Sequence, residues 1–218
     1  MSLLTNLLIN SKDTLAKKIK LLVATASLAA VCAPASAIDV VIVVDVTGST
    51  GAVISSWREN MNTVVDPFLA VDPNARFALV THKDFPFSPY GAPTDYPYQV
   101  EVALTTNLTT FYAALATLGS GGGADSPESQ FEAIYQANTG AGRDLNNDGD
   151  YADAGDIPPQ SLGFNPVTTS VTIHFTTPTD FHNEPYEPNY PYAGVVNHPA
   201  TLADAKNAML AQNNTYFA

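Results

Sequence analysis

An aspartate, a threonine and a serine at alternate positions directly follow a mostly apolar run. The run covers residues 38–44, and the motif D-V-T-G-S after it places a carboxylate at Asp45 and hydroxyls at Thr47 and Ser49. These side chains can direct three hard oxygen ligands to one side of a turn, which suits Mg²⁺ or Mn²⁺. The motif therefore indicates a divalent-cation site. Its spacing alone is equally consistent with two hydroxyls that cap the next helix.

The elements expected around this motif are those of an α/β sheet. A run such as 38–44, β-branched at every position except Asp39, is typical of a strand buried on both faces of a parallel sheet. Alternating strands and helices predict one domain with a Rossmann-like, doubly wound, mostly parallel central sheet flanked by helices. Further strands are expected near 76–81, 98–104 and 170–176, and helices over 51–68, near 109–118, from Ser126 onward and near 202–212.

Acidic residues follow three of the expected strands. Asp45, Asp84 and Asp180 each lie just beyond a strand in the sequence. Because ligand sites of doubly wound sheets lie at the carboxyl ends of the strands, these three residues are expected at the functional edge.

Two further motifs give the chain a family resemblance. The stretch D-S-P-E-S-Q-F-E-A-I begins at Asp125, and D-F-P-F-S-P-Y begins at Asp84. Together with D-V-T-G-S and in this order, they make residues 38–218 resemble the von Willebrand factor A-type domain of integrin β subunits. That family has D-x-P-E-x-x-F-[DE]-A-I and D-x-P-x-S-P-Y motifs, and its metal-ion-dependent adhesion site usually reads D-x-S-x-S.

The resemblance implies two adjacent cation sites that share Glu128. A carboxylate that bridges two cations lets each ion offset the crowding of negative charge. Taken without the resemblance, Pro127 and Glu128 are better explained as the first turn of a helix. The implied primary site for Mg²⁺ or Mn²⁺ contains Asp45, Thr47, Ser49 and Glu128, with Asp180 nearby or acting through water. The implied adjacent Ca²⁺ site contains Asp84, Asp125, the backbone of Pro127, and Glu128.

Some positions depart from the family pattern. A third flanking site needs two acids where this chain has Ala52 and Val53, so that site is expected to be absent. His174 and His182 are expected to form local hydrogen bonds, because hard cations favour oxygen ligands.

An acidic insertion, expected over residues 138–166, carries a second metal-binding pattern. Oxygen-bearing side chains at its first, third and fifth positions, followed by a glycine, resemble the start of an EF-hand or dockerin calcium loop. The glutamate usual at the twelfth position is missing, so a later aspartate must close the loop. The alternative is a solvated acidic loop. The candidate ligands are Asp144, Asn146, Asp148, Asp150, Asp153 and Asp156.

The first 37 residues have the pattern of a secretory signal peptide. Four lysines precede an apolar stretch that ends in A-S-A, so cleavage is expected after Ala37 and no transmembrane helix is expected to remain. The only cysteine, Cys32, lies in this segment. We therefore expect a secreted, extracellular or cell-surface domain of residues 38–218 without disulfides.

The charge of the expected mature chain restricts its partners. Residues 1–37 hold four of the nine Lys and Arg but one of the 21 acids, which leaves five bases against 20 acids. Such a surface repels nucleic acid and anionic lipid and attracts divalent cations.

Two functions from different classes fit these features. The preferred one is a non-enzymatic adhesion or ligand-binding module whose cation at Asp45 accepts a carboxylate from a protein or other ligand. The alternative is a secreted metal-dependent phosphatase or phosphotransferase with Asp45 as the nucleophile. The resemblance also implies another strand and two helices after Ala218, so a truncated product or a fragment is expected.

Overall fold

The computed structural model describes residues 38–177, 181–183, 191–192 and 194–218 of the 218-residue chain. The predicted signal peptide, residues 1–37, and the predicted ligand Asp180 lie outside the described residues.

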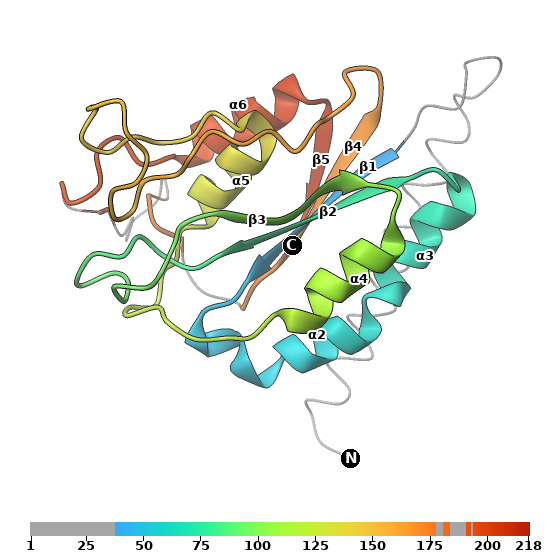
Figure 1. Ribbon diagram of the computed structural model, residues 1–218, viewed down its shortest axis with the longest axis horizontal. Coiled ribbons are helices and arrows are strands. Elements are labelled where there is room, and N and C mark those ends of the chain that lie inside the picture. Colours follow the sequence, from blue (N-terminus) through green and yellow to red (C-terminus); the bar gives the residue numbers. More distant parts are fainter. Residues whose placement is uncertain (1–37, 178–180, 184–190, 193) are drawn as a thin grey trace.

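Five strands form one mixed sheet in the order β3-β2-β1-β4-β5 (Figure 1). Strand β1 is parallel to its neighbours β2 and β4, and β5 is parallel to β4. Strand β3 is antiparallel to β2, which the sequence analysis had not specified. The prediction of an α/β fold with a mostly parallel sheet is confirmed. The strands are β1 (Ile38–Asp45), β2 (Arg76–His82), β3 (Gln99–Thr105), β4 (Thr169–Phe175) and β5 (Asn214–Phe217).

Helices cover both faces of the sheet (Figure 1). None of those in the described part of the chain is long and apolar enough to cross a membrane. One face carries α2 (Ile54–Asn60), α3 (Asn62–Val71) and α4 (Leu108–Thr117), and the other carries α5 (Gln130–Thr139) and α6 (Leu202–Ala211).

The single helix predicted over 51–68 is instead a 3₁₀ turn, η1 (Gly48–Ala52), followed by α2 and α3. At the junction of the two helices, the side-chain amide of Asn60 donates to the Ser56 carbonyl at 2.8 Å, and the Thr63 hydroxyl donates to the Asn60 carbonyl at 2.7 Å. Such side-chain hydrogen bonds compete with the backbone bonds of a helix. These bonds accompany the break between α2 and α3, through which the apolar periodicity continues.

The burial of β1 explains its apolar sequence. All eight of its residues are buried, because it has a strand on each side and a layer of helices on each face. Val40, Ile42 and Val44 belong to the core cluster that includes the apolar side chains of α3 and α4, whereas Val41 and Val43 pack with those of α5. This arrangement fixes Asp45 at the carboxyl end of the central strand.

Helix α5 begins later than predicted. The sequence favoured a start at Ser126 and Pro127, but the helix begins at Gln130. The Ser129 hydroxyl donates to the Lys83 carbonyl at 2.8 Å, which ties this segment to the end of β2 instead of extending the helix. Glu128 therefore lies outside the first helical turn, contrary to the interpretation of Pro127 and Glu128 as a simple helix start.

Candidate metal centre

The turn after β1 brings three predicted ligand oxygens together. Asp45 is fully buried, and its Oδ1 accepts hydrogen bonds from the Thr47 backbone N–H at 2.9 Å and the Thr47 hydroxyl at 2.6 Å. Thr47 Oγ1 lies 3.0 Å from Ser49 Oγ. The Thr47 side chain makes no hydrogen bond that caps η1. The carboxylate and hydroxyls thus form a continuous line of oxygens at the edge of the sheet.

Two threonines after β4 extend this line. The Thr176 hydroxyl donates to Asp45 Oδ2 at 3.2 Å, and Thr177 Oγ1 lies 3.2 Å from Ser49 Oγ. The sequence analysis did not predict these contacts. The sequence feature that could have indicated them is the pair of hydroxyl residues just past β4, because β4 lies beside β1 in the sheet. Asp180, predicted to act here, is not among the described residues.

Glu128 is buried among other acids beside this turn. Its backbone pairs with Phe181, beyond β4, and its carboxyl group shares a hydrogen bond with Thr47. Burial, followed by the charges of Asp84, Asp45 and Asp125, raises the pKa of Glu128 to about 9. Among the described residues, none donates a hydrogen bond to its buried Oε2. A carboxyl group in such surroundings is stabilised by a proton or by a nearby cation.

A glycine run holds the chain close to this carboxyl group. Gly48 N–H donates to the Gly122 carbonyl at 3.0 Å, which joins the run to the turn after β1. Gly123 has a φ of +71°, and a Cβ there would lie 2.7 Å from Glu128 Oε1. A residue with a side chain would therefore be strained and would displace the Glu128 carboxyl group.

A second cluster lies at the end of β2. One ligand atom each from Asp84, Asp125 and His182 lie within 4.8 Å of one another, and in the described part of the chain no other such group of three His, Cys, Asp or Glu was found. His182 Nε2 is 3.2 Å from Asp84 Oδ2 and 3.4 Å from Asp125 Oδ2. This group could hold a metal ion.

Asp84 is held in a fixed orientation. Its Oδ1 accepts hydrogen bonds from the Tyr192 hydroxyl at 2.7 Å and from the Phe85 N–H at 2.5 Å. Burial, followed by the charge of Asp84, raises the pKa of Tyr192 well above its usual range, so this hydroxyl remains a donor. Asp125 is more accessible, with 29% of its side chain exposed. Its pKa is raised mainly by burial.

The sequence analysis missed His182 as a member of this cluster. It gave His182 only a local hydrogen-bonding role, because hard cations favour oxygen ligands. Its position shortly after β4 could have indicated that it lies near Asp84, since the carboxyl ends of β2 and β4 lie at the same edge of the sheet.

His174 forms a buried network of its own. Its Nε2 lies 2.7 Å from His82 Nε2, and its Nδ1 lies 2.9 Å from the Tyr216 hydroxyl. Burial lowers the pKa of both histidines, so neutral rings are favoured. The network links β2, β4 and β5 and gives His174 the local partners that the sequence analysis expected.

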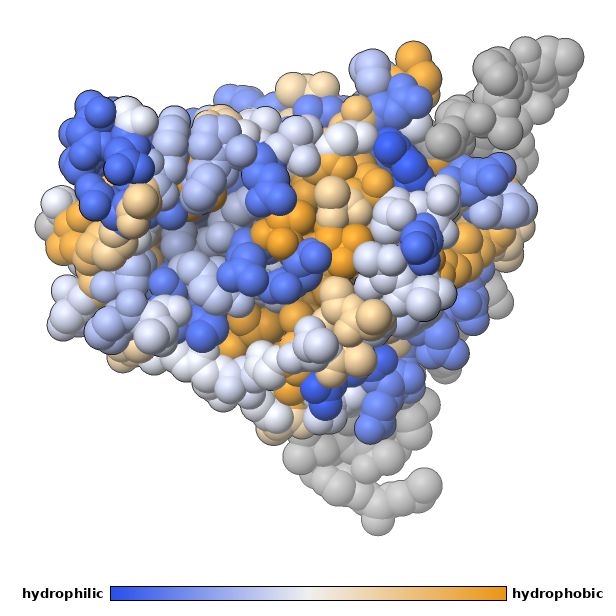
Figure 2. Space-filling model, in the orientation of Figure 1, coloured by the Kyte–Doolittle hydropathy of each residue, from blue (hydrophilic) through white to orange (hydrophobic). Residues whose placement is uncertain are grey.

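The acidic insertion forms a loop closed by its own side chains, and Figure 2 shows hydrophilic residues gathered where Figure 1 draws it, at the upper left. Asp144 accepts hydrogen bonds from two backbone N–H groups of the loop, and Asp156 Oδ1 accepts one from Leu145 at 2.9 Å. The side-chain amide of Asn146 donates to both Asp148 and Asp153. Asp150 accepts from the backbone of Ala152. The predicted ligands therefore share one loop.

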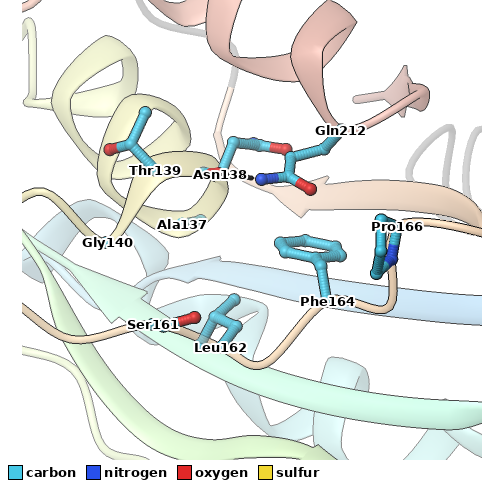
Figure 3. A pocket seen from close by; sticks show the side chains of 9 residues that line it. All are labelled: Ala137, Asn138, Thr139, Gly140, Ser161, Leu162, Phe164, Pro166 and Gln212. Atoms are coloured by element: carbon cyan, nitrogen blue, oxygen red, sulfur yellow. Dashed lines mark hydrogen bonds between the residues drawn. The ribbon is translucent and has the colours of Figure 1, made fainter.

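A pocket of about 240 Å³ lies away from these carboxylates (Figure 3). It lies beside the last residues of α5 and the residues before β4, at the opposite end of the sheet from Asp45. Gln212 donates a hydrogen bond across it to the Asn138 carbonyl at 3.0 Å. No ionisable side chain lines this pocket.

No protein-family model matches the chain, and no curated protein matches it in sequence. The fold and the site define the class: an α/β domain with a mixed, mostly parallel five-stranded sheet flanked by helices, and a candidate metal site.

Proposed function

We propose that this chain is a ligand-binding module of the von Willebrand factor A type that binds a carboxylate of its partner through a divalent cation. The observation that carries the proposal is the line of oxygens from Asp45 through Thr47 to Ser49 at the end of the central strand. The strand order, with β1 in the middle and its turn at the functional edge, supports the same type of fold.

The donor set fits Mg²⁺ or Mn²⁺. Asp45, Thr47, Ser49 and Glu128 offer only oxygen, which these hard ions favour. The buried Glu128 Oε2 has no donor among the described residues, so a cation would satisfy it. Ser49 is exposed, and this leaves one side of the site open to solvent and to a partner.

An adjacent Ca²⁺ site is the second part of the family resemblance. It would contain Asp84, Asp125, the Pro127 backbone and Glu128. The charge of Asp84 contributes more than that of Asp45 to the raised pKa of Glu128, which supports a position for Glu128 between two groups of acids. A cation on either side would lower this repulsion.

Phosphoryl transfer with Asp45 as the nucleophile is the alternative. The basic side chains argue against it, because most of them are already paired with other groups. Such transfer relies on cationic groups that stabilise charge on the phosphoryl oxygens. Arg76 is paired with Asp39 at the other end of β1, Lys83 with Asp95 and Arg143 with Glu132. Arg58 donates to the Leu118 carbonyl, and Lys206 lies on α6.

Selection from a random peptide library in millimolar Mg²⁺ tests the proposed function. Bound peptides are expected to contain Asp or Glu, to dissociate in EDTA, and to lose binding when that acid is changed to its amide. Binding that survives both EDTA and the amide change would contradict a metal–carboxylate bond. Release of phosphate from p-nitrophenyl phosphate that depends on Asp45 would favour phosphoryl transfer instead.

The insertion is proposed to hold a structural Ca²⁺ ion. Asp144, Asn146 and Asp148 supply the first three candidate ligands, and Asp150, Asp153 and Asp156 supply acids that could close the loop. Few apolar residues lie between positions 144 and 156 to order this loop, and the repulsion between its acids falls when a cation binds.

The double variant Asp144→Ala with Asp148→Ala is expected to lose part of the calcium-induced rise in melting temperature and to keep Mg²⁺-dependent binding. Calcium at about a hundred times its Kd adds roughly 2.7 kcal/mol to a folded protein that binds one ion, which corresponds to a shift of a few degrees. Differential scanning fluorimetry with and without Ca²⁺ measures this shift. An unchanged shift would mean that the insertion is only a solvated loop.

A further inference from the structure

Three side chains from separate segments converge at the end of β2. Asp84 follows β2, Asp125 precedes α5, and His182 follows β4, yet one ligand atom of each lies within 4.8 Å of the others. The two carboxylate oxygens lie 3.2 and 3.4 Å from His182 Nε2. Two ligands of a tetrahedral Zn²⁺ ion, each about 2.0–2.1 Å from the metal, are separated by about 3.3 Å. The spacing to the imidazole therefore suits a shared metal ion.

A buried oxygen in this cluster lacks a hydrogen bond. Asp84 is completely buried, and no described residue donates a hydrogen bond to its Oδ2, although its Oδ1 accepts two. This oxygen is the one nearest His182. A buried carboxylate oxygen without a donor is costly, and a bound cation satisfies it.

The surroundings hold the imidazole and the carboxylate in place. The centroid of the His182 ring lies 5.1 Å from that of Tyr90, edge to face, and 4.1 Å from that of Tyr192. The Tyr192 hydroxyl also donates to Asp84 Oδ1. Outer hydrogen bonds of this kind orient metal ligands and increase metal affinity.

We propose that Asp84, Asp125 and His182 bind a first-row transition-metal ion, Zn²⁺ or Mn²⁺, through two carboxylate oxygens and one imidazole nitrogen. The family resemblance implies Ca²⁺ at this place, but Ca²⁺ takes oxygen ligands, whereas imidazole nitrogen selects transition metals. None of the three ligands belongs to the turn at Asp45. The inference deepens the adjacent-site part of the proposed function and stands independently of a cation at Asp45.

Pulsed electron paramagnetic resonance of the purified protein with Mn²⁺ tests the nitrogen ligand. The wild-type spectrum is expected to contain modulation from a directly bound imidazole nitrogen, since an all-oxygen site gives none. His182→Gln is expected to lose this modulation. The matched control is His198→Asn, which removes an exposed histidine and is expected to keep the nitrogen modulation. Asparagine tolerates the φ of 49° at that position, so the backbone should not change.

Zn²⁺ calorimetry in excess Ca²⁺ tests the ion preference. Wild type is expected to bind Zn²⁺ despite the Ca²⁺, and His182→Gln to bind it at least about tenfold more weakly, the loss typical even of outer-shell changes. Asp45→Ala is expected to retain the Zn²⁺ affinity. A failure of the proposed cation site at Asp45 can therefore be told apart from a failure of the proposed site at His182.

Three results would overturn the inference. They are wild-type protein without nitrogen modulation, modulation that persists in folded His182→Gln, and Zn²⁺ binding that Ca²⁺ abolishes. Each would mean that His182 forms only an ion pair with the two aspartates. Because the first and third use wild-type protein, they hold even if His182→Gln fails to fold.

Discussion

Replacing Glu128 with glutamine is expected to make the metal-free protein more stable at pH 8 and to remove most of the fall in its stability between pH 7 and pH 9. The pKa of Glu128 is raised from 4.5 to about 9, so the folded chain keeps a proton that the unfolded chain releases. The contribution of Glu128 to the free energy of unfolding is therefore fully present below pH 4.5 and is lost as the pH rises towards 9. Between these limits Glu128 lowers the free energy of unfolding by up to about 1.4 kcal/mol per pH unit.

Urea unfolding of EDTA-treated protein from pH 7 to pH 9 measures this effect, because below pH 7 the lowered pKa values of His82 and His174 add a slope of opposite sign. A matched control is Glu59→Gln, which removes an exposed glutamate from α2 and is expected to keep the wild-type slope. A part of the slope is expected to remain in Glu128→Gln, because the pKa of Asp125 is also raised. Equal slopes in wild type and Glu128→Gln would contradict a protonated, buried Glu128.

Added Mg²⁺ is expected to reverse the order of stability of the two proteins. In wild type the cation replaces the proton on Glu128, and in Glu128→Gln it loses a charged ligand. Because the ligand must be deprotonated, the Mg²⁺ affinity of wild type should also rise with pH.

The strands were predictable because their sequence patterns reflect burial. The apolar run 38–44 corresponds to β1, which has strands on both sides and helices on both faces. The direction of β3 was not predictable in the same way. Its pattern of exposed and half-buried residues fits an edge strand of either direction, and only the pairing with β2 makes it antiparallel.

The turn at Asp45 was predictable because its ligands lie close together in the sequence. Thr47 and Ser49 follow Asp45 within four residues, so local geometry alone brings their oxygens together. The contacts of Thr176 and Thr177 depend on the position of β4 beside β1, and no local pattern specifies that position.

His182 was the most important ligand that the sequence did not predict, because its contacts also depend on the position of the chain after β4. It meets Asp84 and Asp125 only because the segment after β4 pairs with Glu128, where His182 N–H donates to the Glu128 carbonyl at 3.3 Å. The start of α5 was misplaced because Ser126 and Pro127 are favourable helix-start residues. The bonds of Ser129 to the Lys83 carbonyl outweigh that local preference.

The site as a whole is a set of acids that a cation would stabilise. Asp45, Asp84 and Glu128 are almost completely buried at one edge of the sheet, in a chain with few basic residues. The basic side chains of the described region form ion pairs or hydrogen bonds with groups other than these three acids or, for Lys206, lie on α6. Divalent cations are therefore the natural source of balancing charge at this edge.

Mg²⁺ titration calorimetry of wild type and Asp45→Ala tests the central claim most directly. Wild type is expected to bind Mg²⁺, and Asp45→Ala to lose that binding while it still unfolds cooperatively in EDTA. Asp45→Asn, which keeps a hydrogen-bond acceptor for Thr47, should lose the binding as well, whereas Asp66→Ala on the exposed side of α3 should retain it. An unchanged Mg²⁺ affinity in Asp45→Ala would contradict a cation site at this turn.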